Sequence, residues 1–335
     1  MVGFDKQIVQ IDIREGAMRV GILAYDSCLA SGVHGFSDTL AVANLIMERE
    51  VFGTTVLSAD GGPVRCFAGA VVRADEALSD ALPGERRWDI VYIPPAFGLT
   101  EPDALLTGWL GGAHASGAVV CGACAGVFFL AGAGILRGRP ATTHWGLAQA
   151  FTARFPDVPL DTDRMLVDGD DYVCAGGVTA YFDLALHLVA RHASPEAALS
   201  CARTLLLDPG RVRQTPYMNL LPAAADKTVA KACRWLEDNH ARPVRMRELA
   251  EAMFLTERTL LRRFRGSVGR TPVQYLQAVR IERAKRLLAT GGESADEIAA
   301  MVGYADATAF FKAFRELTGL TPGEYRRRFG IASPQ

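Results

Sequence analysis

A cysteine and a histidine twenty residues apart have the types and spacing that could support covalent chemistry. Cys124 stands in Gly122-Ala-Cys-Ala-Gly126, between two apolar runs. Small residues on both sides of a nucleophile are typical of a sharp strand-to-helix turn that presents its side chain. A thiol at the amino end of a helix also meets the positive end of the helix dipole, which lowers the pKa of a cysteine. His144, in Thr142-Thr-His-Trp145, could sit beside the thiol as its base.

A lone cysteine and a lone histidine are more often core residues than partners, but the turn-forming glycines favour a shared pocket. Cys121 lies three residues before Cys124, which is also the spacing of thiol–disulfide sites. We expect Cys121 to lie within the strand and to point into the sheet packing, so a redox role for this pair is the lesser alternative. A zinc site would need further ligands at compatible spacing, and we predict neither a metal nor a cofactor.

The elements that would hold these residues alternate between β-rich and helical stretches. Strands are expected at residues 19–25, 51–58, 89–93 and 118–122, and helices at 35–49, 101–115 and 127–133. This alternation predicts a parallel sheet with helices on both faces, where ligands bind beyond the carboxyl ends of the strands. The uncharged stretch from Gly117 to Leu136 is as long as a membrane span. It holds five glycines, so we predict a buried strand, turn and helix instead.

The C-terminal third contains two stretches that match at a separation of fifty residues. Thr256–Phe264 is followed by Gly269–Tyr275, and Ala307–Phe314 is followed by Gly319–Tyr325. The matched pairs are Phe254 with Tyr304, Leu260 with Phe310, Arg262 with Lys312, Phe264 with Phe314, and Arg265 with Arg315. Apolar and basic positions recur together, which indicates one helical unit used twice.

Each unit is predicted to be two short helices joined by a tight turn. Thr256 and Asp306 are candidate N-caps for the second helices, and Ser294-Ala-Asp-Glu297 is a capping box for the first helix of the second unit. Arg258, Leu261 and Arg262 would share one outward face, as would Thr308, Ala309 and Lys312. Such pairs are helix-turn-helix units; a helical bundle with a solvated arginine face is the alternative. A long helix from Pro272 to about Ala289 could set both units into successive major grooves, roughly 34 Å apart.

The net charge of −1 hides an uneven distribution. From Asp226 onward, 20 Lys and Arg face 13 Asp and Glu, a balance of +7, whereas the preceding 225 residues have a balance of −8. A basic C-terminal third on an acidic body fits a nucleic-acid-binding module attached to a domain with another role. Seven scattered cysteines and no leader-like start indicate free thiols in a reducing compartment, which predicts a cytoplasmic protein without a membrane partner.

Residues 227–330 resemble the DNA-binding domains of the AraC/XylS family. The resemblance is carried by Arg-x-Leu-x-Arg-x-Phe at 258–264, the helix Arg280–Leu288, Gly303-Tyr304, Phe310, Phe314 and the ending Gly319–Arg326. The family usually has glycine in the first turn, where this chain has Phe254. The resemblance implies binding to promoter DNA. We expect Arg258, Leu261 and Arg262 to read one groove and Thr308 and Lys312 the next, while Arg263, Arg265 and Arg315 contact phosphate or solvent.

Residues 18 to about 215 resemble the PfpI/ThiJ superfamily, which has a class I glutamine-amidotransferase-like fold. The matching segments are Cys124–Gly134, Gly138–Trp145, Ala175–Ala180 and Asp183–Val189. The superfamily's cysteine and histidine map onto Cys124 and His144. A PfpI-like domain fused to an AraC-type module is similar to the GlxA-type regulators, which sense small metabolites and control catabolic operons.

The superfamily's enzymes bring a carboxylate near the cysteine from the loop after the first strand. Here that segment reads Ser31-Gly-Val-His-Gly-Phe36, with Gly35 in place of the acid. Without the acid, the thiol–histidine pair lacks the group that would orient or protonate it. We therefore predict a pocket lined by Gly32, His34, Cys124 and His144 that binds a ligand without converting it.

These features predict an α/β domain with a flavodoxin-like parallel sheet, followed by an all-α domain with two helix-turn-helix units. We expect an N-terminal extension at 1–17, the ligand-sensing domain at 18–215, a linker at 216–226 and the DNA-binding domain at 227–330. The predicted function is transcription regulation and not catalysis, by a homodimer that binds promoter DNA, RNA polymerase and an amine- or amino-acid-like effector. The alternatives are a cysteine-dependent hydrolase, hydratase or lyase at Cys124, and a thiol redox sensor.

Overall fold

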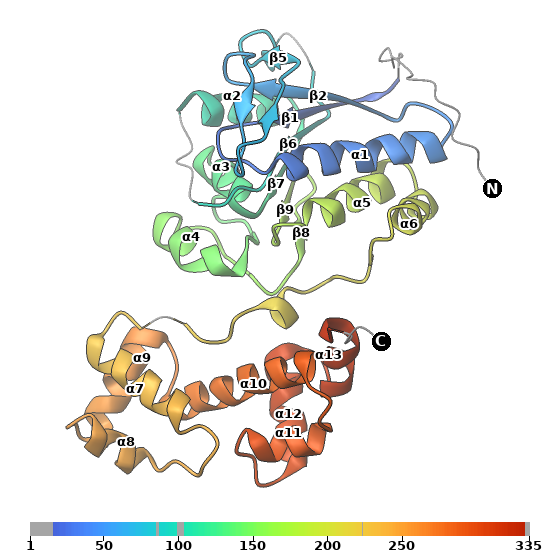
Figure 1. Cartoon of the computed structure of the whole chain (residues 1–335). Coiled ribbons are helices and arrows are strands. Elements are labelled where there is room, and N and C mark those ends of the chain that lie inside the picture. The colour runs from blue at the N-terminus through green and yellow to red at the C-terminus, as the bar shows by residue number, and fades with distance from the viewer. Residues whose placement is uncertain (1–15, 85–86, 99–103, 223, 332–335) are drawn as a thin grey trace. The chain divides into compact units, whose positions relative to one another are not determined.

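The computed structural model describes residues 16–84, 87–98, 104–222 and 224–331. The chain forms two compact units that divide between Gln214 and Thr215, and each can be followed by colour in Figure 1. The first unit contains a large sheet covered by helices, and the second is built from helices. The predicted N-terminal extension lies almost wholly outside the described residues.

Seven strands of the first unit form one sheet in the order β5-β2-β1-β6-β7-β9-β8. Their bounds are β1 Met18–Leu23, β2 Phe52–Ser58, β5 Glu76–Ala77, β6 Ile90–Ile93, β7 Val119–Ala123, β8 Leu166–Asp168 and β9 Tyr172–Ala175. Neighbouring strands run parallel except β8 and β9, which are antiparallel. The central strands are buried on both faces, as in other parallel sheets covered by helices. The predicted parallel sheet is confirmed, and the antiparallel edge was not predicted.

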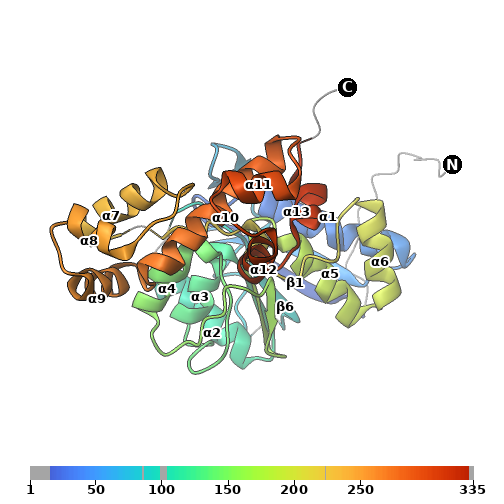
Figure 2. The ribbon, with the colours of Figure 1, turned by 90° about the horizontal axis from the view of Figure 1, so that it is seen from below.

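Helices cover both faces of this sheet (Figure 2). One face carries α1 Ala30–Ile46, α5 Tyr181–His192 and α6 Pro195–Thr204, and the other carries α2 Ala104–Ala115 and α3 Val127–Gly132. Smaller elements are α4 Ala148–Arg154, the separate hairpin of β3 Val64–Arg65 and β4 Val71–Val72, and short 3₁₀ turns at Cys124–Gly126 (η1), Trp145–Leu147 (η2) and Thr215–Tyr217 (η3). The first three residues of the helix predicted at 101–115 lie outside the described residues.

Helix α1 begins five residues earlier than the sequence analysis expected, so Gly32 and His34 lie on a helix and not in a loop. A close approach explains this, because a side chain at Gly32 would meet Pro95 at 2.6 Å. The backbone N–H of Leu29 also donates to the carbonyl of Pro95 (2.8 Å), which fixes the start of the helix next to the end of β6.

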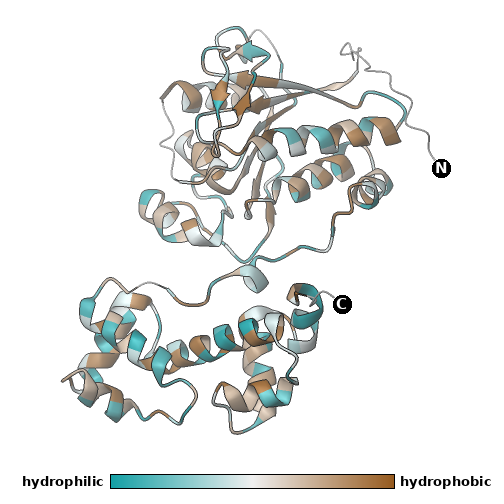
Figure 3. Cartoon of the chain, viewed as in Figure 1, coloured by the Kyte–Doolittle hydropathy of each residue, from teal (hydrophilic) through white to brown (hydrophobic). Residues whose placement is uncertain are grey.

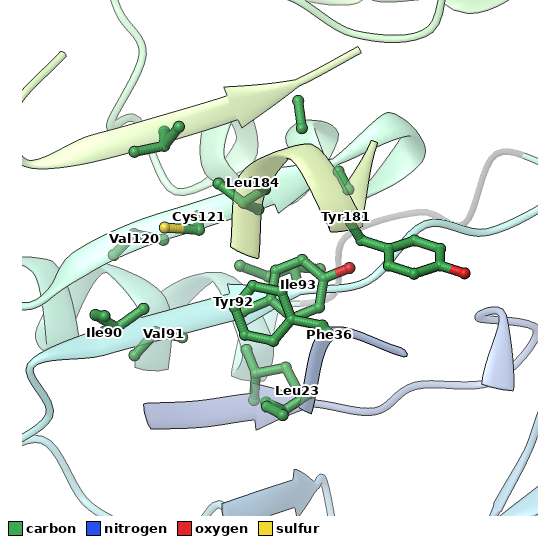
Figure 4. Close-up of a cluster of buried hydrophobic side chains, with 14 of the residues drawn as sticks. Leu23, Phe36, Ile90, Val91, Tyr92, Ile93, Val120, Cys121, Tyr181 and Leu184 are labelled. Carbon is green, nitrogen blue, oxygen red and sulfur yellow. The ribbon is translucent and has the colours of Figure 1, made fainter. Parts of the chain in front are cut away.

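One part of the first unit's core lies between α1, α5 and the middle of the sheet (Figure 4), and the rest lies under α2 and α3 on the other face. The ring of Phe36 on α1 stacks on that of Tyr92 on β6, with centroids 3.9 Å apart. Colouring by hydropathy shows the same arrangement, with apolar strands inside and polar residues spread over the outer helices (Figure 3). This burial fixes the position of the carboxyl ends of β1, β6 and β7. The thiol motif around Cys124 comes directly after β7.

The helical unit contains two separate hydrophobic cores that share one long helix. Its helices are α7 Lys227–Asp238, α8 Met246–Ala252, α9 Glu257–Val268, α10 Pro272–Thr290, α11 Ala295–Met301, α12 Ala307–Thr318 and α13 Pro322–Phe329. Leu260 and Phe264 of α9 are buried in the first core, and Phe310 and Phe314 of α12 occupy the second. The predicted pair of helix-turn-helix units joined by a long helix is therefore confirmed.

The ends of the repeated helices also match. Thr271 and Thr321 each close a capping box ahead of a proline, and Gly269 and Gly319 end α9 and α12 with φ of 70° and 75°. A left-handed backbone at these helix ends suits glycine. The second helix of one unit and the second helix of the other are therefore matched at a separation of 50 residues.

The predicted match of Phe254 with Tyr304 is wrong. Phe254 has φ of 55°, and the residue with the same role in the second turn is Gly303, with φ of 94°. The N–H of Leu255 donates to Ala250, and that of Tyr304 donates to Ala299, both at 2.9 Å. Up to this turn the two units therefore repeat every 49 residues, and the second turn is one residue longer.

Candidate functional site

The outward face of α9 combines two cations with one apolar side chain. Thr256 caps the helix by accepting from the N–H of Thr259 (3.3 Å). Because Leu260 and Phe264 are buried, Arg258, Leu261 and Arg262 are turned outward and exposed. Within the described chain, neither arginine makes a hydrogen bond or an ion pair with protein. Their donors remain available to an external acceptor.

Helix α12 repeats this arrangement with different chemistry. Asp306 caps it by accepting from the N–H groups of Thr308 and Ala309, both at 3.1 Å. Thr308 is exposed, and the side chain of Lys312 is 78% exposed, with only a loose approach of 3.9 Å to Glu316. The second face thus offers a hydroxyl and an ammonium group.

A groove of about 360 Å³ runs beside the exposed face of α9. It is lined from α9 by Arg258, Leu261 and Arg265, with Glu257 and Leu260 beside them, and by Thr271 to Val273 at the start of α10. The groove joins apolar surface to guanidinium groups. A helix face of this composition can follow a polyanion and still make apolar contacts with it.

One cation of α9 has a structural role that the sequence analysis missed. Arg263, expected to contact phosphate or solvent, donates from Nε and Nη2 to the carboxylate of Asp226 (both 2.8 Å) and from Nη2 to Thr228 (3.1 Å). Asp226 in turn caps α7 and has its pKa lowered, chiefly by the hydrogen bond from Arg263. Arg263 therefore fixes α7 against α9.

The two helix-turn-helix units also touch directly, beyond their connection through α10. Arg280 of α10 donates to the carbonyls of His240 (2.9 Å) and Arg242 (3.1 Å) in the loop after α7. A side chain at Gly303, in the second turn, would meet the carbonyl oxygen of His240 at 2.5 Å. Glycine is thus required on two counts, its φ of 94° and this close approach. The contact holds α9 and α12 in a fixed relation.

In the first unit, the backbone at Cys124 has the strained conformation expected of a nucleophile turn. Its φ is 53°, in the left-handed region that costs about 1–2 kcal/mol for a residue with a side chain. A side chain at Gly122 would meet Leu130 at 2.9 Å, and one at Gly126 would meet the carbonyl oxygen of Ile93 at 2.5 Å. Both glycines are needed, so the predicted elbow is confirmed.

The predicted lowering of the thiol pKa is wrong. Cys124 is only 3% exposed, and burial raises its pKa to about 12, with a smaller opposing effect of the N–H of Ala125. Desolvation of the thiolate therefore outweighs the favourable helix end. At neutral pH the thiol is protonated.

In the described part of the chain, His144 makes no hydrogen bond to the Cys124 thiol, although the preceding residue, Thr143, bonds to the elbow. Thr143 donates from its hydroxyl to the carbonyl of Cys124 (2.7 Å), whereas His144 Nδ1 accepts from the N–H of Gly146 (3.1 Å). Within the described chain, His144 makes no hydrogen bond to Cys124 Sγ. The pKa of His144 is lowered by burial, so the ring is predominantly neutral at pH 7.

The remaining predicted pocket residues lie on the first turns of α1. Gly32 is buried against Pro95, and His34 is exposed. At Gly35, where the superfamily's acid would map, a side chain would meet the ring of Tyr181 at 2.7 Å. This position thus has no space for a carboxylate. Cys121 points into the sheet packing as expected (Figure 4).

Comparison with known proteins matches each unit to a described family. Residues 33–191 match the DJ-1/PfpI family and residues 249–328 match a helix-turn-helix domain. The HTH-type transcriptional regulator ArgR of Pseudomonas aeruginosa is 32% identical over 223 residues, which cover 65% of this chain and 67% of ArgR. The chain belongs to the AraC-type transcriptional regulators that carry a DJ-1/PfpI domain.

Two further HTH-type transcriptional regulators match nearly the whole chain. CdhR of P. aeruginosa is 28% identical over 302 residues, covering 89% of this chain and 88% of CdhR. GlxA of Rhizobium meliloti is 26% identical over 327 residues, covering 93% and 96%. The predicted GlxA-type architecture is confirmed, and this regulator is a DNA-binding protein.

Solved structures support the same fold for the regulator's first unit. An AraC family transcriptional regulator from Pseudomonas putida superposes with a TM-score of 0.50 at 24% identity, covering 56% of this chain and 99% of that one. A ThiJ/PfpI family protein from Pseudomonas syringae gives the same TM-score at 19% identity, covering 73% and 97%. Among the helices that the structure describes, none is long and apolar enough to cross a membrane.

The segment predicted to begin a linker is packed against the regulator's helical unit. The ammonium group of Lys285 on α10 donates to the carbonyl of Met218 (2.7 Å) and to Glu282 (2.8 Å), while Glu282 accepts from the N–H of Leu220 (2.9 Å). Leu221 contacts both hydrophobic cores. Sequence reasoning missed this clamp, although a lysine at an apolar helix position was a signal for it.

Proposed function

We propose that α9 and α12 read promoter DNA in two successive major grooves. Arg258 and Arg262 would bond to base edges, with Leu261 against a thymine methyl group, and Thr308 and Lys312 would read the second groove. The exposure of these side chains, and the absence of protein acceptors for Arg258 and Arg262 among the described residues, support this assignment. The direct contact between the two units supports a fixed spacing. Arg265 and Arg315 would hold phosphate.

We also propose that the first unit binds an amine- or amino-acid-like effector without converting it. Gly32, His34, Cys124 and His144 would line the site. The observation that carries this proposal is the burial of the Cys124 thiol, which raises its pKa, together with the absence, within the described chain, of a hydrogen bond between its Sγ and His144. The elbow keeps its strained shape, but a reactive thiolate is not stabilised. Such a site suits recognition more than covalent catalysis.

The regulator would act in the cytoplasm as a homodimer that presents its DNA-binding units to paired sites and contacts RNA polymerase. Support comes from its relatives, which carry the names of transcriptional regulators. Two-fold symmetric sites are the usual partners of dimeric helix-turn-helix proteins.

The DNA assignment is tested with Arg262→Ala in the full-length chain, measured by fluorescence anisotropy on a promoter selected by the wild-type protein. A loss of about 1–3 kcal/mol on the selected site, with relaxed preference at one base position, is expected. Arg315→Ala is the matched control: it should weaken binding to all sequences alike and reduce the salt dependence. A sequence-independent loss in Arg262→Ala would contradict the assignment.

The effector assignment is tested by melting the full-length protein in the presence of amines and amino acids. A ligand that raises the melting temperature of the wild type but not of His144→Ala would support it. The second candidate function is a cysteine-dependent hydrolase, hydratase or lyase activity, which the retained backbone strain at Cys124 favours. Turnover of a small amide, isonitrile or dicarbonyl that disappears in Cys124→Ser would establish that alternative.

A further inference from the structure

Two cysteines that the proposed function does not use lie side by side in the first unit. The sulfur atoms of Cys28 and Cys66 are 3.7 Å apart, and both residues are buried. Cys28 follows β1, and Cys66 follows β3 in the small hairpin. They are 38 residues apart in sequence, so nothing local brings them together. The contact is a product of the fold.

The hairpin is fastened to the segment after β1 at this point. The N–H of Ser27 donates to the carbonyl of Arg65 (3.0 Å), and that of Phe67 donates to the carbonyl of Cys28 (2.9 Å). Because these bonds lie on either side of the thiols, they keep the two sulfur atoms in register. β3 and β4 pair only with each other among the described strands, so the hairpin can separate without breaking the main sheet.

The pair lies beside exposed aromatic surface, and its two cysteines differ in exposure. Phe67 and Phe97 are each about half exposed, at 49% and 50%, and their rings lie 4.7 Å apart. Cys66, next to Phe67, retains 5% exposure, whereas Cys28 has none. Cys66 is therefore the sulfur that an external reagent meets first.

The pair also lies next to the Cys124 elbow. The N–H of Cys28 donates to the carbonyl of Tyr25 (3.0 Å), and the ring of Tyr25 packs on Phe129 of α3 with centroids 4.8 Å apart. The hydroxyl of Tyr25 donates to the carbonyl of Pro94 (2.8 Å). The buried side chain of Tyr25 therefore connects Cys28 to the helix that follows the elbow.

We propose that Cys28 and Cys66 form a reversible disulfide by exchange with a low-molecular-weight disulfide such as oxidised glutathione. The thiolate of Cys66 attacks one sulfur of the reagent, forms a mixed disulfide and releases one thiolate, which takes up the proton that Cys66 has lost. Cys28 then attacks the Cys66 sulfur, passes its proton to the departing thiolate and releases the second thiol. Two protein thiols are oxidised while one external disulfide is reduced to two thiols. The bond ties the hairpin to the segment after β1, beside the elbow.

Tryptic cleavage separates this pair from the other thiols. After oxidation of the full-length protein with oxidised glutathione, alkylation and digestion, Cys28 falls in peptide 20–49 and Cys66 in peptide 66–73, while Cys121 and Cys124 share peptide 88–137. We expect peptides 20–49 and 66–73 to be joined, free thiols to fall from seven to five, and dithiothreitol to restore them. The melting temperature of the oxidised protein should rise.

Cys28→Ala and Cys66→Ala should each prevent this cross-link, and the matched control Cys121→Ala should not. A cross-link within peptide 88–137 in place of the expected one would overturn the proposal, as would wild-type protein that keeps all seven thiols free at a concentration of oxidant that oxidises an accessible dithiol. The wild-type peptide map decides the question even where a variant fails to fold.

Discussion

The guanidinium carbon of Arg280 lies 5.3 Å from the centre of the Tyr304 ring. Arg280 comes from the long helix α10, and Tyr304 from the turn of the second helix-turn-helix unit. The same guanidinium donates to the backbone after α7, in the first helix-turn-helix unit. Burial lowers the pKa of Arg280, which is the cost of placing a cation where the two helix-turn-helix units meet. The spacing of the recognition helices therefore depends on this side chain as well as on α10.

Replacing Arg280 with Met should remove two charge-assisted hydrogen bonds and the contact with Tyr304. We expect the free energy of unfolding to fall by about 1–3 kcal/mol. Affinity for DNA that spans both major grooves should fall more than affinity for DNA that offers only one of them. Urea unfolding and anisotropy on the two DNA lengths measure these effects. Arg283→Met, one turn along α10, is the control. Equal losses on both DNA lengths would argue against a role in spacing.

Lys285→Met should destabilise the helical unit by leaving Glu282 buried without its cation. The two side chains are 8% and 15% exposed, and removing one partner of a buried pair costs about 3–5 kcal/mol. In Lys285→Met/Glu282→Gln, the amide oxygen can still accept from Leu220 and no buried charge remains. Most of the stability should therefore return in urea unfolding. A double variant as unstable as the single one would show that the pair is not the cause.

Features that depend on neighbours in sequence were predictable. The caps at Thr256, Ser294 and Asp306 and the glycines around Cys124 all follow from local backbone requirements, and the structure confirms them. The same local reasoning wrongly matched Phe254 with Tyr304. One extra residue in the second turn changes the repeat from 49 to 50 residues, so the match of the helices after the turn hid the different match before it.

Features that depend on distant pairs were not predictable. Arg263 bonds to Asp226, 37 residues away in sequence, and Lys285 bonds to Met218, 67 residues away. The sign of the pKa shift at Cys124 failed for a related reason. The local helix end favours the thiolate, but the burial that prevails is set by the packing of the whole unit.

Phe254→Gly should stabilise the helical unit. Phe254 has φ of 55° and is 95% exposed, so the change relieves backbone strain of about 1–2 kcal/mol and loses almost no packing. Allowing for the greater freedom of glycine in the unfolded chain, we expect a gain of about 1 kcal/mol in the free energy of unfolding. Calorimetry should show a higher melting temperature. The reciprocal change Gly303→Ala should lower it, and a stabilising effect there would contradict the strain argument.

Cys124 should react slowly with iodoacetamide in the folded protein. Because burial raises its pKa to about 12, the thiolate is scarce at pH 7.5, and alkylation should be at least about a hundredfold slower than in urea. Mass spectrometry of peptide 88–137 in Cys121→Ala follows this one thiol. Labelling as fast as in the unfolded chain would instead indicate an activated nucleophile and favour the enzyme alternative.

The buried thiols should make the first unit sensitive to alkali. Burial raises the pKa of Cys124 and Cys174 to about 12 each, whereas an unfolded cysteine titrates near about 8.5. A raised folded pKa gives stability that is fully present below about pH 8.5 and is lost as the pH rises toward the folded value. The loss from each such thiol should steepen toward about 1.4 kcal/mol per pH unit as the pH rises beyond the unfolded pKa.

Urea unfolding between pH 8.5 and 9.5, with a phosphine reductant to prevent disulfides, measures this slope. Cys174→Ala removes one thiol that lies outside the elbow motif, on the neighbouring strand β9, so its slope should be shallower than that of the wild type by the contribution of one thiol. Its stability at pH 7 serves as the reference, because the small cavity left by the substitution affects all pH values equally. A slope that does not change in Cys174→Ala would mean that this thiol ionises in the folded chain, and its burial would then not control the titration.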